Sequence, residues 1–90
     1  MDFDKAVASI KAQSFEENKM TVAKQVLKGN YLNCAQIKTI MKLFSFETTK
    51  LDFAKLAYDK CVEKNNYYLI NDAFGFSSSV DDLNEYIEGK

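Results

Sequence analysis

Apolar residues recur every three or four positions along almost the whole chain. This spacing places them on one face of an α-helix, because an α-helix completes a turn every 3.6 residues. The pattern predicts six helices, at about residues 3–13, 15–28, 34–44, 46–63, 67–74 and 79–88. Each helix then has one apolar face that must pack against a partner. The sequence therefore predicts an all-α fold, a compact stack of about six short helices.

Polar residues between the apolar stretches are typical of helix starts. Asn33 and Gln36 have the spacing of a capping box, in which two side chains bind each other's free backbone amides. We predict further N-caps at Ser14 (paired with Glu17), at Ser45, and at Ser78 or Ser79.

The sequence also repeats itself with a period of about 30 residues. A shift of 31 positions places Ser14, Phe15, Glu16, Lys19, Met20, Ala23 and Lys24 on Ser45, Phe46, Glu47, Lys50, Leu51, Ala54 and Lys55. The repeat predicts three helix-turn-helix units, at about residues 3–30, 33–63 and 66–88. Units of this size cannot bury an apolar face alone, so we expect them to stack. Residues 1–90 then form one domain, which we expect to be a piece of a longer protein.

Two turns of the form Phe-x-Phe occupy equivalent places in the second and third units. They are Phe44-Ser45-Phe46 and Phe74-Gly75-Phe76. In one interpretation both rings pack, one on its own hairpin and the other on the next unit. In the other, one ring of each turn is exposed and contacts a partner.

Composition narrows the possible partners. Apolar residues make up 47% and charged residues 28% of the chain, with neither proline nor histidine, as expected for a small helical domain with one core. The formal net charge is −1, and every basic residue is a lysine. A chain with so little net charge has no strong field to attract nucleic acid or anionic lipid. No apolar run is long enough to span a membrane. We therefore expect no nucleic-acid partner and no membrane span.

Catalytic and metal-binding patterns are absent from the sequence. General acid–base chemistry usually uses histidine or a perturbed carboxylate, and the paired acids Glu16-Glu17 and Asp81-Asp82 both lie at predicted helix starts, where acids favour the helix dipole. Cys34 and Cys61 have no histidine to activate them or to complete a metal site. Two interpretations of this pair stay open: buried structural thiols, or a disulfide. We expect a protein that is not an enzyme and needs no metal or cofactor.

Tyrosines and lysines supply the candidate contact surface. Two adjacent tyrosines on a helix cannot both face inward, so at least one of Tyr67 and Tyr68 should be partly exposed. Exposed tyrosines are common in protein interfaces, although their rings can equally lie along a neighbouring helix. The predicted contact residues are Tyr31, Tyr67 and Tyr68, with Lys19, Lys24, Lys50 and Lys55 as a rim. Alternatively, these lysines lie on a helix face that is exposed to solvent and contacts no partner.

An ordered series of motifs in residues 32–87 resembles a known family. The series contains Leu32, Gln36, Ile40, Phe44-Ser45-Phe46-Glu47, Lys50-Leu51, Phe53-Ala54-Lys55, Ala57-Tyr58, Asn66-Tyr67, Asp72-Ala73-Phe74, Phe76-Ser77, Leu83 and Tyr86-Ile87. It is similar to the domain of unknown function 4476, a helical domain of about the length of this chain. The resemblance implies occurrence in bacteria, often at the end of longer exported proteins, and in some animal proteins. It implies no activity, cofactor or site residue.

These observations favour a non-enzymatic helical module that binds a protein partner or serves as a scaffold. The sequence identifies neither the partner nor the oligomeric state. The alternative is a small-ligand or lipid-binding domain, which would need an enclosed apolar cavity between the helices.

Overall fold

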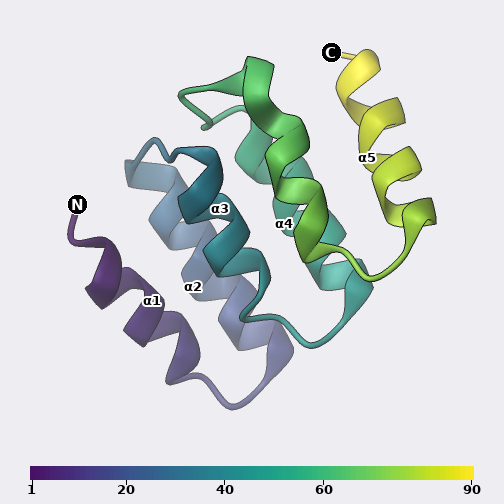
Figure 1. Cartoon of the computed structure of the whole chain (residues 1–90). Helices are drawn as coiled ribbons and strands as arrows, with labels where there is room; N and C mark the ends of the chain where they lie inside the picture. Colours follow the sequence, from purple (N-terminus) through teal and green to yellow (C-terminus); the bar gives the residue numbers. More distant parts are fainter.

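Six helices follow one another along the chain, in a computed structural model that describes residues 1–90 (Figure 1). They are α1 (Phe3–Lys11), α2 (Glu16–Gly29), α3 (Cys34–Met41), α4 (Glu47–Tyr58), η1 (Lys64–Ala73) and α5 (Ser77–Glu88). The helix η1 is a 3-10 helix with a kink at Asn66, and the others are α-helices. The extended structure is limited to one isolated bridge, between Leu32 and Cys61. The all-α prediction is confirmed.

The helices pack into a molecule of 32 × 25 × 19 Å. α2, α4 and α5 are neighbours in that order, α1 packs on α2, and α3 packs on both α4 and η1. The turns that precede α2, α4 and α5 therefore lie along the same lower edge in Figure 1. That the three helix pairs are copies of one unit stays a prediction. None of the six helices combines the length and the apolar character needed to cross a bilayer.

The core receives apolar side chains from every helix. Its largest fully buried members include Ile10 of α1, Ile37 of α3, Phe53 of α4 and Ile70 of η1. The ring of Phe44 packs against that of Phe53, with 5.8 Å between centroids. Phe44 thus closes the end of the α3–α4 pair from inside the molecule.

The predicted end of the fourth helix needs correction. α4 stops at Tyr58, five positions before the predicted end. The chain beyond it turns back to pair with residue 32: the N–H of Leu32 donates to the carbonyl of Lys60, and the N–H of Val62 donates to the carbonyl of Leu32, both at 2.9 Å. Residues 60–62 pair with Leu32 and are therefore not part of α4. The 3-10 helix η1 begins after this pairing, at Lys64.

One predicted cap is confirmed and three are wrong. The N–H of Gln36 donates to Asn33 Oδ1 at 2.8 Å, and the N–H of Asn33 donates to Gln36 Oε1 at 2.9 Å, as a capping box requires. The predicted serine caps do not form. The N-cap residues of α2, α4 and α5 are Phe15, Phe46 and Phe76, whose side chains cannot accept a hydrogen bond.

Candidate functional site

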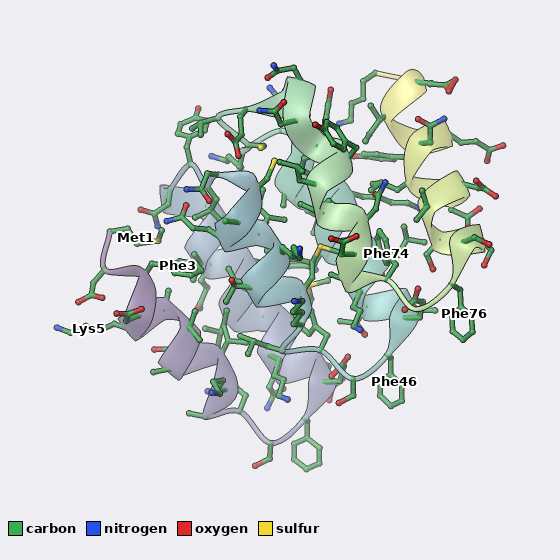
Figure 2. The ribbon with its side chains drawn as sticks, viewed as in Figure 1. Met1, Phe3, Lys5, Phe46, Phe74 and Phe76 are labelled. Carbon is green, nitrogen blue, oxygen red and sulfur yellow. The ribbon has the colours of Figure 1, made fainter.

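Three phenylalanine rings project from one edge of the molecule. Phe15, Phe46 and Phe76 each occupy the residue immediately before an α-helix, and their exposed fractions are 67%, 61% and 66%. Figure 2 shows the labelled rings of Phe46 and Phe76 pointing away from the helices at this edge. We call these three side chains the phenylalanine row. Their exposure is unusual because each ring could contribute roughly 1.5–3 kcal/mol if it were buried.

The two Phe-x-Phe turns divide their rings in the same way. In the first turn Phe44 is buried and Phe46 is exposed; in the second, Phe74 is half-buried and Phe76 is exposed. One ring of each turn is therefore free to contact a partner, as the second sequence interpretation expected. Sequence reasoning did not single out Phe15, although the shift of 31 aligns it with Phe46.

A carboxylate from α2 holds the turn before α4. Glu16 accepts hydrogen bonds from the backbone N–H of Ser45 at 3.0 Å and from that of Phe46 at 2.9 Å. Partial burial acts to raise the pKa of Glu16, but the hydrogen bonds from Phe46 and Ser45 outweigh it and lower the pKa below its usual value. The carboxylate therefore stays ionised at neutral pH and fixes the backbone that carries the Phe46 ring.

A second carboxylate holds the turn before α5 in the same way. Glu47 accepts from the N–H of Gly75 at 3.0 Å, from the N–H of Phe76 at 3.1 Å, and from the hydroxyl of Ser79 at 2.6 Å. Partial burial acts to raise the pKa of Glu47, but these three donors lower it overall. Glu47 thus holds the turn that leads into α5, where no predicted serine cap forms. Ser79 is buried and supports the carboxylate instead of capping its own helix.

The predicted lysine rim divides into two pairs. Lys19 Nζ donates to the carbonyl of Leu43 at 3.2 Å, and Lys50 Nζ donates to the carbonyl of Ala73 at 3.1 Å. Ala73 is the last residue of η1 and Leu43 lies two positions after the end of α3, where backbone acceptors lack intrahelical partners. Lys19 and Lys50 therefore fasten neighbouring elements and do not form a free basic surface.

The other two lysines line a shallow depression over α2 and α4. Lys24, Lys55 and the ring of Tyr86 border this depression, whose volume is about 330 Å³. Lys55 Nζ lies 5.6 Å from the centroid of the Tyr86 ring, within the range of a cation–π contact. The four predicted lysines thus do not form one surface.

One of the two adjacent tyrosines is exposed, as predicted: Tyr68 is exposed and Tyr67 is buried. Tyr67 is buried, its hydroxyl donates to the carbonyl of Ala54 at 2.5 Å, and its ring meets that of Tyr58 edge-on at 5.0 Å. Burial is the main cause that raises the pKa of the Tyr67 hydroxyl far above its usual value. Tyr67 is therefore not available for an exposed contact, and its inclusion among the contact residues was wrong, because this side chain fills the core between η1 and α4.

Tyr68 and Tyr31 are exposed but lie in different surroundings. Tyr68 lines an open groove of about 420 Å³ between η1 and α5, together with polar residues such as Asn71 and Asn84. Tyr31 does not line this groove, and its ring packs under Lys60 Nζ at 4.9 Å. Both remain candidates for contact with a partner.

The two cysteines lie side by side in the interior. Their Sγ atoms are 3.7 Å apart, and both side chains are buried as free thiols. Burial, followed by the neighbouring Cys61 thiol and Glu63, raises the pKa of Cys34 to about 12. Thiolate is the reactive form of cysteine, so this environment disfavours a nucleophilic role for Cys34.

Acidic residues do not gather into a cluster. Glu16 and Glu17 open α2, as predicted, but α5 begins at Ser77 and leaves Asp81 and Asp82 exposed in its second turn. No group of three or more Cys, Asp and Glu side chains has the arrangement of a metal site.

Comparison with known proteins identifies one similarity. A family model described as "Domain of unknown function (DUF4476)" matches residues 1–87. No curated protein and no solved structure gives a significant match to the chain.

Proposed function

The chain belongs to the DUF4476 family, and the description of this family names no activity. From the surface of the domain we propose that it is a non-enzymatic module, which binds a protein partner through the phenylalanine row. The observation that carries this proposal is the exposure of Phe15, Phe46 and Phe76 along one edge. A soluble surface gains nothing from exposing three large rings together, whereas aromatic side chains are enriched at the centres of protein interfaces.

The area of the row suits a contact of modest size. A phenylalanine side chain offers about 200 Å², so three rings that are about two-thirds exposed present about 400 Å² of apolar surface. This total, summed over rings on three different turns, is of the size of a single apolar patch that is often functional. A standard interface buries about 800 Å² on each partner, so we expect the rings to form its centre and polar residues its rim.

Hydrogen bonds to two glutamates hold the backbone that carries two of the three rings. The Glu16 carboxylate fixes the backbone amide of Phe46, and the Glu47 carboxylate fixes that of Phe76. A surface that is ordered before binding loses less conformational entropy on association. This preorganisation supports the row as a binding surface rather than as a mobile loop edge.

The recurrence of these contacts also supports the repeated unit. Glu16 and Glu47 are 31 positions apart, and so are Lys19 and Lys50, and each pair makes the same kind of bond to the element that follows. We infer that the three helix pairs are copies of one unit, and that the row repeats because its unit repeats.

The alternative functions have less support. A small-ligand or lipid-binding role calls for an enclosed apolar cavity, whereas the largest depressions, of about 420 Å³, open to solvent and include polar linings such as Asn71 and Asp81. The proposal includes no catalytic step, since the carboxylates of Glu16 and Glu47 are held by backbone donors and the chain has no histidine to activate either thiol as a catalytic nucleophile.

Affinity capture tests the proposal. The wild-type domain and the triple variant Phe15→Ala, Phe46→Ala, Phe76→Ala are immobilised at equal density and exposed to extract of the source cells. A Tyr31→Ala, Tyr68→Ala variant, which changes exposed rings outside the row, is the matched control. We expect at least tenfold lower recovery of bound proteins for the triple variant alone, with circular dichroism confirming that it is folded. Equal recovery by wild type and triple variant would reject the row as the contact surface. Loss with the tyrosine variant would instead assign the contact to Tyr31 and Tyr68.

A further inference from the structure

The chain contains two cysteines, and the fold brings them together from the two ends of one helix pair. Cys34 is the first residue of α3, and Cys61 lies three positions after the end of α4. Although the two residues are separated by 27 positions, their Sγ atoms lie 3.7 Å apart. This distance is van der Waals contact between two sulfurs, so little motion separates the thiols from bonding distance.

The backbone around the thiols fixes this approach. Two hydrogen bonds of 2.9 Å pair Leu32 with the segment from Lys60 to Val62, and the N–H of Cys34 donates to the Glu63 carboxylate at 2.9 Å. The two cysteine-bearing segments are therefore held side by side by bonds that involve neither sulfur. The fold therefore holds the backbone of the two cysteines close together.

We propose that Cys34 and Cys61 are a built-in site of covalent cross-linking, and that they form an intramolecular disulfide when the domain meets a low-molecular-weight disulfide such as oxidised glutathione. The S–S distance would shorten to about 2.05 Å. One protein thiol loses its proton and attacks the small disulfide, which releases one small thiol and leaves a mixed disulfide. The second protein thiol then loses its proton and attacks the protein sulfur, which releases the other small thiol. The protein loses two hydrogens, and one small disulfide is reduced to two thiols.

Burial determines when this reaction occurs. Cys34 and Cys61 are 1% and 5% exposed, and neither lines any of the surface depressions. A small disulfide must therefore reach them during folding or after local opening of the segment around residues 60–66. For the same reason, the finished bond is shielded from reductants in the folded domain. The pair is thus suited to permanent cross-linking as the chain folds rather than to rapid cycling.

Refolding under defined redox conditions tests the cross-link. The wild-type domain is refolded from urea with oxidised and reduced glutathione, then unfolded, treated with an alkylating agent and weighed by mass spectrometry. We expect a monomer that has lost two hydrogens, takes up no alkyl group, and melts about 10 °C or more above the reduced form. Cys34→Ser and Cys61→Ser variants should instead retain one thiol, free or bound to glutathione. Two alkylated thiols in wild type, or only glutathione adducts and intermolecular dimers, would overturn the proposal.

A second measurement tests the shielding separately. The oxidised domain is exposed to a fixed concentration of dithiothreitol with and without urea, and the release of thiols is followed over time. We expect reduction in urea to be at least a hundredfold faster than reduction of the folded domain. Equal rates would show that the bond is accessible in the native state, and would reject the permanent cross-link in favour of a reversible one.

Discussion

Replacing Glu47 with alanine removes the carboxylate that holds the turn before α5. Three hydrogen bonds are lost, from the N–H groups of Gly75 and Phe76 and from the hydroxyl of Ser79. The two amides are near the surface and can bind water instead, so they contribute little to the cost. The Ser79 hydroxyl is buried and loses its acceptor, and an unsatisfied buried group costs about 1–3 kcal/mol. We therefore expect the free energy of unfolding to fall by about 1–3 kcal/mol, which lowers Tm by about 5–20 °C in a domain of this size.

The same variant should change the response to acid. The folded-state pKa of Glu47 lies below its unfolded value of about 4.3, so its contribution to stability is complete above that value. The contribution is lost as the pH falls through the folded pKa, because the protonated group no longer accepts the same bonds. Wild type should thus lose more stability than Glu47→Ala between about pH 5 and pH 3.

Urea unfolding followed by circular dichroism measures both effects. The matched control is Glu17→Ala, because Glu17 is also in the first turn of a helix but is exposed and its carboxylate accepts no hydrogen bond from the protein. We expect this control to cost at most about 1 kcal/mol, through the helix dipole alone. The reasoning is refuted if Glu47→Ala costs no more than Glu17→Ala, or if its stability falls with acid as steeply as that of wild type.

Three further predictions concern the core, the row and the thiols. Tyr67→Phe removes the hydrogen bond to the Ala54 carbonyl and should lower the free energy of unfolding in urea by about 1 kcal/mol; no change would mean that the bond contributes nothing. Phe53→Ala should cost about 3–5 kcal/mol and Phe46→Ala less than about 0.5 kcal/mol, since the first ring is fully buried and the second exposed; similar costs in thermal melts would contradict the assigned burial. Because the pKa of Cys34 is raised to about 12, its contribution to stability is complete below the unfolded pKa of about 8.5 and is lost as the pH rises toward 12. Reduced wild type should therefore lose stability more steeply than Cys34→Ala between about pH 8 and pH 10.5, and parallel curves would exclude this linkage.

The helices were predictable because their signal is local. Apolar spacing located all six elements, and Asn33 with Gln36 located a start, since a capping box needs only residues three positions apart. The early end of α4 was not predictable. It depends on the pairing of Leu32 with the segment after Lys60, which are nearly 30 positions apart, and helical periodicity carries no information about such a contact.

The same distinction explains the candidate site. The predicted serine caps were wrong, and Glu16 and Glu47 hold the turns before α4 and α5 through donors that lie 28 to 32 positions away. Sequence reasoning predicted that at least one of the two adjacent tyrosines is exposed. It could not identify the buried one, because Tyr67 fits beside Ala54 and only the packed structure defines that space. The repeat contained the signal for the phenylalanine row, because it placed Phe15 and Phe46 in equivalent positions.

The two glutamate contacts also give the molecule a direction. Glu16 and Glu47 both reach toward a turn later in the chain, so the α3–α4 pair receives a carboxylate at the turn before α4 and offers its own carboxylate to the turn before α5. A second copy of residues 32–61, inserted after Cys61, would bring both halves of this joint with it. Such an insertion would lengthen the domain by one helix pair and extend the aromatic edge to a fourth ring.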